Sequence, residues 1–241
     1  MKILVIGSCT NKKKFTHNFE PNCNDIRSIN DLKKFINKYP EKSCKAKDMY
    51  IGNQHISLLN AIKILKNICQ IDYLILSAGY GLLDSEELIS SYNCSFAGMT
   101  PEQIMERSRL LNIEIDYQKN ISKNYNLVYL ALGLDYSLSL GAWDKYITCP
   151  TIAFQKSKNQ NVLSLKANNE VVSKYSKLGY KINGVNGFKG DFLLIIAKII
   201  QKNVDPCANL DKISSSVTEL QNFISNKVGK PKNRTILDFY K

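Results

Sequence analysis

Short runs of apolar residues alternate with longer segments that are apolar only at helical spacing. Residues 2–6, 73–76 and 127–132 are nearly continuous apolar runs, and each ends at Gly or at Ser-Ala-Gly. Runs of this length, bounded by small residues, are typical of strands that are buried on both faces of a sheet. The pattern therefore predicts three buried strands in the first half of the chain.

Helical segments separate these strands. Apolar residues recur at helical spacing over residues 54–69. Thr100, Pro101 and Gln103 form a helix start with a capping box, and we expect that helix to run to about residue 122. Strands that alternate with helices indicate an open α/β sheet. The expected fold is α/β, with an open, mainly parallel sheet in three layers and helices on both faces.

The second half of the chain is patterned less clearly. It shows short apolar runs at 151–154 and 161–165, an apolar helix at 191–201 and a weaker helix at 210–227. Glycines at 184, 187 and 190 precede the apolar helix, where a phosphate could bind, or they form a glycine-rich turn without a ligand. We expect an α/β domain over residues 1–205, a C-terminal helix within 206–227 and a flexible basic tail over 228–241.

The charge balance is strongly basic. The chain has 241 residues, a formal net charge of +12 and a sequence pI near 9.3. Such a charge favours acidic partners such as nucleic acid or nucleotides. A Lys- and Asn-rich proteome would explain the same charge equally well, because both residue types are scattered along the whole chain.

Cysteine usage and hydropathy indicate the compartment. The seven cysteines include no C-x-x-C pair, and there are two histidines, so the sequence predicts neither a zinc site nor a cofactor. Scattered, unpaired cysteines favour a reducing compartment. The longest apolar stretch, 192–200, is interrupted by Lys198 and is too short to span a bilayer. We expect no membrane association and a cytoplasmic protein, or a nuclear or viral-factory one if the source is eukaryotic or viral.

The first strand end carries the strongest candidate chemistry. Ligands of open α/β sheets bind at the carboxyl ends of the strands, and Ser8, Cys9, Thr10 and Lys12 follow the first strand. The hydroxyls of Ser8 and Thr10 could form an anion-binding loop with backbone N–H groups. Cys9 could be a nucleophile if Lys12 lowers the pKa of its thiol. Alternatively, Cys9 is a small buried residue beside solvated lysines.

Other candidates follow the second and third strands. Ser77, Tyr80 and Gly81 suit a turn that directs the Tyr80 ring outward to stack on a base, or an ordinary turn with a core tyrosine. After the third strand, Gly133 is followed by Asp135 and Tyr136, which bring a carboxylate and a phenol to the same rim and are a weaker signal. Asp48 is either a general base or an exposed turn residue.

Taken in order, these segments resemble a prokaryotic and phage family whose members read S-C-x-x-K, D-L-Y-x-G, L-S-A-K-Y-G-L-L and P-Y. The matching positions are Ser8, Cys9, Lys12, Asp48, Tyr50, Gly52, Ser77, Ala78, Tyr80, Gly81, Leu82, Leu83 and Tyr92. Gly133 and Tyr136 also resemble the family's G-x-x-Y, so the resemblance covers roughly residues 1–145. Two positions depart from the pattern, with Gly79 where the family usually has Lys and Ser91 in place of Pro.

More distantly, the same segments are similar to the core domain of archaeosine synthase, which modifies a 7-deazaguanine base in tRNA and resembles uracil-DNA glycosylase. The resemblance implies a site that holds a nucleobase or nucleotide between the first two strand ends. The expected substrate-binding residues are Ser8, Thr10, Ser77, Tyr80, Gly81, Tyr92 and Gly133, and the expected catalytic residues are Cys9, Lys12 and Asp48.

These features predict an enzyme that acts on a nucleobase or nucleotide in nucleic-acid modification, repair or defence. Cleavage of a glycosidic bond and base substitution both suit the site. A non-catalytic nucleic-acid-binding module and a sensor of free nucleotides are the alternatives.

The end of the chain resembles a peptide that binds sliding clamps. Ile236 would be the aliphatic plug, and Phe239 and Tyr240 the aromatic pair, with basic residues on the N-terminal side. Alternatively, these three residues pack back onto the domain as a terminal helix.

Overall fold

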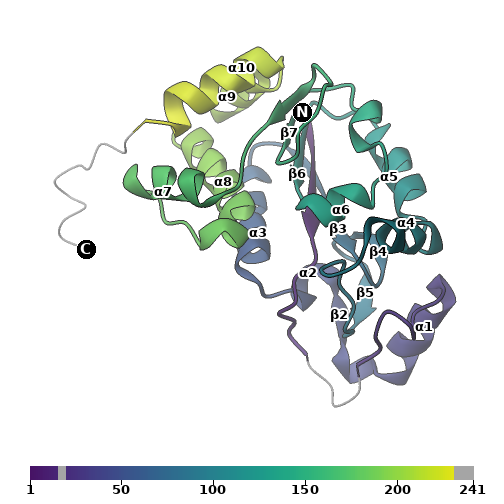
Figure 1. The fold of residues 1–241 in the computed structure, drawn as a ribbon. Helices are drawn as coiled ribbons and strands as arrows, with labels where there is room; N and C mark the ends of the chain where they lie inside the picture. Colours follow the sequence, from purple (N-terminus) through teal and green to yellow (C-terminus); the bar gives the residue numbers. More distant parts are fainter. Residues whose placement is uncertain (16–19, 231–241) are drawn as a thin grey trace.

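A central, mostly parallel sheet organises the chain (Figure 1). The computed structural model describes residues 1–15 and 20–230, and in that part of the chain the sheet has six strands in the order β4-β3-β1-β6-β7-β8. The strands are β1 (Lys2–Ser8), β3 (Gln70–Ser77), β4 (Gly81–Asp84), β6 (Leu127–Ala131), β7 (Thr151–Ala153) and β8 (Val162–Ser164). Neighbours are parallel except for β4, which pairs antiparallel with β3 at one edge.

Helices cover both faces of this sheet (Figure 1). On one face, α3 (Asn53–Leu65) and α8 (Gly184–Gln201) pack against each other. On the other face lie α4 (Pro101–Leu110), α5 (Ile113–Ile121) and α6 (Leu134–Leu138). The expected three-layer α/β architecture is confirmed, because the buried apolar strands require a layer of helices on each side.

The strand order reverses at β1. From β1 the chain passes through α3 to β3 on one side of β1, and then through α4 and α5 to β6 on the other side. The loops that leave the carboxyl ends of β1 and β6 therefore diverge toward opposite faces. In doubly wound sheets, ligands bind in the crevice at such a point. We call this place, between the carboxyl ends of β1 and β6, the switch crevice.

Smaller elements surround the central layers. They are α1 (Ile29–Lys38), η1 (Pro40–Lys42), β2 (Ser43–Lys45), α2 (Ala46–Met49), β5 (Leu88–Ser90), η2 (Trp143–Tyr146), α7 (Asn169–Lys177), α9 (Pro206–Ile213), α10 (Val217–Phe223) and the π-helical turn η3 (Ile224–Val228). Strands β2 and β5 form a separate antiparallel pair.

Two helices that the pattern predicted as continuous are broken. The capping box of Thr100 and Gln103 is present, but Asn112 adopts φ 53°, in the left-handed region, and separates α4 from α5. The expected C-terminal helix within 206–227 is wrong as a single element, because Ser216 caps a new helix after α9. Asn enters the left-handed region more readily than most residues, and the Ser216 side chain accepts the N–H of Glu219, so each ends a helix that an apolar period alone would continue.

The glycines before the apolar helix do not form the predicted turn at its start. Helix α8 already begins at Gly184, so Gly187 and Gly190 lie inside it. A Cβ atom at Gly190 would lie 2.2 Å from the carbonyl oxygen of Gln54. Gly190 therefore allows α8 to approach α3 closely, and helix packing explains it without a phosphate.

The structure corrects the prediction of unpaired cysteines and covers only part of the predicted tail. Cys23 and Cys94 form a disulfide, which joins the segment before α1 to the segment after β5. No helix in the described ranges is both long and apolar enough to cross a membrane. The clamp-binding residues Ile236, Phe239 and Tyr240 lie outside the described residues.

Candidate functional site

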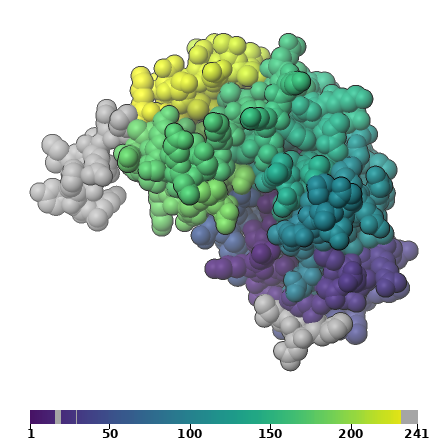
Figure 2. All heavy atoms as spheres, viewed as in Figure 1, coloured from purple at the N-terminus to yellow at the C-terminus, as the bar shows by residue number. Residues whose placement is uncertain are grey.

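The switch crevice brings the first and third strand ends together. Cys9 follows β1, and its N–H donates to the carbonyl oxygen of Leu76 on β3 at 2.8 Å. The Sγ atom of Cys9 lies 3.1 Å from the hydroxyl oxygen of Tyr136, which belongs to α6 just beyond β6. This contact spans the crevice between residues that are 127 positions apart in the sequence. Figure 2 shows the surface hollowed where the N-terminal segment lies between the green region of α7 and α8 and the teal region of α4 to α6.

Gln54 connects the two strands that border the crevice. This buried residue lies in the first turn of α3, and its Nε2 donates to Ser8 Oγ at 3.1 Å and to the carbonyl oxygen of Ala131 at 3.0 Å. One amide group thus holds the ends of β1 and β6 at a set separation. The predicted substrate-binding residue Ser8 is brought into the site, with its hydroxyl already accepting one hydrogen bond.

Thr10 closes the loop after β1. Its Oγ1 donates to the carbonyl oxygen of Lys12 at 2.8 Å and accepts the N–H of Gly52 at 3.3 Å. The loop therefore lies against the start of α3. Because both bonds are internal, the hydroxyl of Thr10 stabilises the loop in this structure.

Lys13, and not the predicted Lys12, is turned into the protein. Lys12 and Lys14 are exposed, whereas Lys13 is half-buried, with its Nζ 4.5 Å from the ring centroid of Tyr92. A short antiparallel pairing of Lys13 with Tyr50 makes the local backbone extended, and successive side chains of extended backbone point in opposite directions. Burial lowers the pKa of Lys13, although electrostatic attraction from Cys9 and Glu20 opposes the shift.

Three hydroxyl groups meet behind the loop, at the end of β3. The hydroxyl oxygen of Tyr92 lies 2.7 Å from Ser77 Oγ and 2.8 Å from the hydroxyl oxygen of Tyr50. All three side chains are buried. Burial raises the pKa of both tyrosines, so they stay neutral and hydrogen-bonded to each other.

Tyr80 does not point outward, as its two flanking glycines had suggested. Its ring is largely buried and meets the ring of Tyr92 edge-on, with centroids 5.1 Å apart. The hydroxyl accepts the N–H of Ser90 at 3.0 Å and donates to the Ser90 carbonyl oxygen at 3.1 Å. Burial raises the pKa of Tyr80 to about 12. This tyrosine is therefore part of the wall behind the site.

Gly81 has a conformational role in the same turn. Its φ is +78°, and a Cβ atom there would lie 3.0 Å from the carbonyl oxygen of Leu111. Glycine adopts this backbone conformation without the strain that other residues would suffer. Gly81 thus lets the chain reverse from β3 into β4.

The two departures from the motif set fit this structure. A Cβ atom at Gly79 would lie 2.5 Å from the Tyr92 ring, so a lysine at this position would displace the ring. Ser91 is buried, and its hydroxyl lies 2.8 Å from the carbonyl oxygen of Phe15 and 2.7 Å from Glu20 Oε1. Gly79 thus leaves room for the Tyr92 ring, and Ser91 connects the loop after β1 to the segment after β5.

Asp48 and Gly133 occupy different surroundings. Asp48 is exposed on α2. This exposure favours the second of its two predicted roles, an exposed surface residue, over that of a general base. Gly133 precedes α6 at the switch crevice, and a Cβ atom there would meet no described atom within 4 Å. Gly133 therefore leaves open space beside the strand ends.

Sequence reasoning placed Cys9 correctly at a strand end but did not predict its contacts. Gln54 was not singled out at all, whereas Lys13 was an alternative motif lysine and Tyr136 was placed at the same rim, neither with an assigned role. The Tyr136 side chain reaches Cys9 only because β6 lies next to β1, which the local sequence does not reveal.

The surroundings of the Cys9 sulfur include a hydrogen-bond donor and a positive charge. Burial, and then the nearby Cys9, raise the pKa of Tyr136. The phenol therefore keeps its proton and can donate it in a hydrogen bond to the Cys9 sulfur. Lys13 adds a positive charge to the same surroundings. We refer to Cys9, Lys13 and Tyr136 as the thiol cluster.

A scan against protein-family models matches none, and a search of curated proteins finds no significant match. The resemblance to the phage family and to archaeosine synthase therefore stays a prediction.

Proposed function

We propose that this protein binds a nucleobase or nucleotide in the switch crevice and acts on it as an enzyme of nucleic-acid modification, repair or defence. The Cys9–Tyr136 contact carries the proposal, because it puts a potential nucleophile and a hydrogen-bond donor at the strand reversal.

The surroundings of the crevice suit a nucleotide. Gly133 leaves space beside the strand ends, and the exposed ammonium groups of Lys12 and Lys14 lie on the loop that borders them. The base would occupy the crevice, and these two lysines would neutralise phosphate charge. This arrangement also gives Lys12 a binding role in place of the predicted catalytic one.

The chemistry follows from the thiol cluster. The Cys9 thiol would pass its proton to water, and its sulfur would form a bond to C1′ of the nucleotide while the N-glycosidic bond breaks and its electron pair passes to the base. Lys13 would donate a proton to the departing base, because burial lowers its pKa and makes it a stronger acid. Water would then displace the thiolate and complete hydrolysis, or a second base would displace it and complete a substitution.

Incubation with single nucleoside 5′-monophosphates and with DNA and RNA oligonucleotides tests the proposal. Released base is measured by liquid chromatography with mass spectrometry, and binding by native mass spectrometry. We expect Cys9→Ala to bind but to release no base, and Asp48→Asn to retain activity. Full activity of Cys9→Ala would contradict the assigned nucleophile, and binding that survives crevice mutations would contradict the site.

A non-catalytic nucleic-acid-binding module is the second candidate. It is favoured by the outward orientation of Lys12 and Lys14 on one loop. Such a module would tolerate Cys9→Ala but would lose affinity steeply with salt, because phosphate contacts release counterions. A sensor would instead bind a free nucleotide and ignore oligonucleotides.

The sliding clamp stays a proposed partner. The test is whether a peptide of residues 228–241 binds to a purified clamp. A peptide that carries both Phe239→Ala and Tyr240→Ala is the control and should not bind.

A further inference from the structure

Helix α8 begins beside the switch crevice, on one side of the hollow in Figure 2. A Cβ atom at Gly187 would lie 3.7 Å from the Cβ atom of Asn53, the first residue of α3. After α8 the chain reaches the opposite edge of the sheet, where the Sγ atom of Cys207 lies 3.8 Å from the carbonyl oxygen of Ile68, just before β3. Helix α8 therefore runs from the carboxyl ends of the strands toward their amino ends, and its first turns border the crevice.

Lys189 lies on the side of α8 that faces the sheet. It begins a stripe at helical spacing that continues with Leu193, Ile196 and Ile200, all of which are buried. The hydroxyl of Tyr129 on β6 donates to the carbonyl oxygen of Lys189 at 2.5 Å. Because the Cα–Cβ bonds of a helix tilt toward its N-terminus, the Lys189 side chain leads from this contact toward the carboxyl end of β6.

Two contacts fix the backbone at Lys189. Tyr129 bonds to its carbonyl oxygen, and the next residue, Gly190, packs against the backbone of Gln54. The side chain of the same Gln54 donates to the carbonyl oxygen of Ala131, at the end of β6. Lys189 is thus one residue away from the contact that joins α8 to the strand ends.

The ammonium group of Lys189 has no acidic partner in the part of the chain that the structure describes. Its side chain is half-buried, and none of the salt bridges there includes it. Burial lowers the pKa of Lys189, and no nearby carboxylate opposes this shift. A cation that is partly removed from water loses solvation free energy, which a bound anion would restore.

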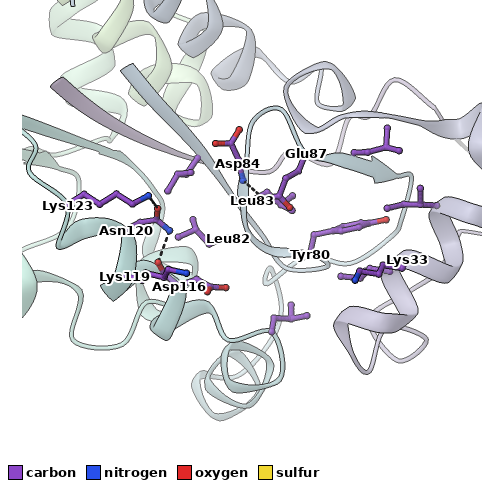
Figure 3. A pocket seen from close by; sticks show the side chains of 15 residues that line it. Lys33, Tyr80, Leu82, Leu83, Asp84, Glu87, Asp116, Lys119, Asn120 and Lys123 are labelled. Atoms are coloured by element: carbon purple, nitrogen blue, oxygen red, sulfur yellow. Dashed lines mark hydrogen bonds between the residues drawn. The ribbon is translucent and has the colours of Figure 1, made fainter. Parts of the chain in front are cut away.

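A groove of about 510 Å³ beside the edge strand β4 provides a contrast (Figure 3). It is lined by lysines and carboxylates in equal number, namely Lys33, Lys119, Lys123, Asp84, Glu87 and Asp116. A surface of balanced charge selects neither an anion nor a cation. Lys189 pairs with no described carboxylate, so the α8 side of the switch crevice favours an anion.

We propose that Lys189 binds the phosphate group of the nucleotide from the α8 side of the switch crevice. This inference rests on the proposed function, and it narrows the substrate class to molecules with a phosphate on the ribose, as opposed to a free base or a nucleoside. The contact between Cys9 and Tyr136 lies on the α6 side. The ribose would therefore lie between the two sides, with C1′ near the thiol and the phosphate near the ammonium group.

Lys189 would act differently from Lys12 and Lys14, which also meet phosphate in the proposed function. Those two side chains are exposed, so water and salt screen their attraction for an anion. Lys189 is half-buried, where a charge attracts an anion more strongly than it does in bulk water. High salt should therefore weaken the contribution of the exposed lysines and spare most of the contribution of Lys189.

Isothermal titration calorimetry of the full-length protein with ribose 5-phosphate tests this proposal. Lys189→Met keeps the length of the side chain and removes its charge, so it should weaken binding by about tenfold or more. Lys189→Arg keeps the charge and should stay within about threefold of the wild type. Lys198→Met, an exposed position in the last turn of the same helix, is the matched control and should stay within about twofold.

Two further comparisons isolate the phosphate contact. Ribose, which has no phosphate, should bind more weakly than ribose 5-phosphate and should not distinguish the wild type from Lys189→Met. In high salt, the effect of Lys189→Met on ribose 5-phosphate should persist, whereas the effect of Lys12→Met with Lys14→Met should largely disappear.

The phosphate of a free nucleotide and that of a nucleic acid strand share this chemistry. A single-stranded oligonucleotide is therefore titrated as a second phosphate probe. A loss on Lys189→Met that is confined to ribose 5-phosphate would identify a free nucleotide, and a loss that includes the oligonucleotide would identify a strand.

Circular dichroism checks that Lys189→Met is folded, and Lys189→Gln replaces it if it is not. The proposal would be overturned if neither phosphate probe bound the wild type, if the folded variant bound both as tightly as the wild type, or if ribose bound as tightly as ribose 5-phosphate. None of these measurements requires turnover. Phosphate binding through Lys189 without base release would contradict the proposed reaction alone, and base release that is insensitive to Lys189→Met would contradict this inference alone.

Discussion

Two polar clusters lie at different places beside the central sheet, and they differ in how completely their groups are paired. In the first, which we call the carboxylate cluster, Asp191 of α8 accepts three hydrogen bonds. They come from Ser57 Oγ at 2.6 Å, Asn183 Nδ2 at 2.8 Å and the Asn183 N–H at 2.6 Å. This cluster joins α3 to the start of α8. Its carboxylate is fully used within the protein.

The thiol cluster is paired less completely. Among the described residues, Cys9 Sγ has one hydrogen-bonding contact, with Tyr136, and Lys13 lies over the Tyr92 ring without a salt bridge. Burying polar groups costs free energy in both clusters. The comparison teaches that complete pairing is typical of a structural role, whereas incomplete pairing at a strand reversal leaves groups available for a ligand.

Asp191→Ala should have the largest effect on stability. It leaves the buried donors of Ser57 and Asn183 without an acceptor, so the free energy of unfolding should fall by about 3 kcal/mol. Urea unfolding measures this loss. Asp191→Asn keeps one acceptor oxygen and should lose less. A loss below about 1 kcal/mol for Asp191→Ala would show that the carboxylate is not structural.

Cys9→Ala should separate the two clusters most clearly. We expect base release to fall at least about 100-fold, because the nucleophile is removed. The free energy of unfolding should change by no more than about 1 kcal/mol, since only a small side chain is lost. Cys9→Ser, which retains a hydroxyl, provides the matched variant. Equal and large stability losses for Cys9→Ala and Asp191→Ala would remove the distinction.

Lys13 should make the reaction sensitive to alkaline pH. The reaction requires the ammonium form, and burial lowers its pKa from 10.5. As the pH rises, the rate of base release should therefore begin to decline at a lower pH than the one at which an ordinary lysine loses its proton. Lys13→Arg should shift the decline to higher pH, with a rate reduced by about tenfold. An unchanged pH profile would exclude Lys13 as the proton donor.

The same shift predicts how the stability of the folded protein depends on pH. Between the lowered pKa of Lys13 and 10.5, the unfolded chain binds more protons than the folded one. Burial of the Lys13 ammonium group lowers the free energy of unfolding. This loss is fully present below the pKa of Lys13 in the folded protein, and it is relieved as the pH rises from that pKa to 10.5. Lys13→Met should remove this contribution, which urea unfolding at several pH values would detect.

Tyr50→Phe should produce the smallest change. It deletes one hydrogen bond to Tyr92, so the free energy of unfolding should fall by about 1 kcal/mol. Tyr117→Phe, which loses a bond to the carbonyl oxygen of Trp143, is a matched control away from the site. We expect both to lose similar stability, but only Tyr50→Phe to raise KM for the nucleotide. A raised KM in both would point to a general packing effect.

Local sequence signals predicted the buried strands and the capping box at Thr100 well. They failed where a distant segment decides the outcome. Gly190 was predicted to lie in a turn, with or without a ligand, yet it is a contact point inside a helix for the backbone of Gln54. For Tyr80 the sequence left an outward ring and a core tyrosine open, and the structure shows the core tyrosine, with both hydrogen-bond partners of its hydroxyl supplied by Ser90.

By itself, the sequence determined the three buried strands β1, β3 and β6 and that Cys9 follows the first of them, because hydrophobic periodicity and glycine positions are local properties. Only the tertiary structure decided that β6 lies beside β1, and hence that Tyr136 meets Cys9. It also decided that Lys13 is turned inward while Lys12 is exposed. Strand order and side-chain direction depend on contacts between residues far apart in the chain, and no local pattern records them.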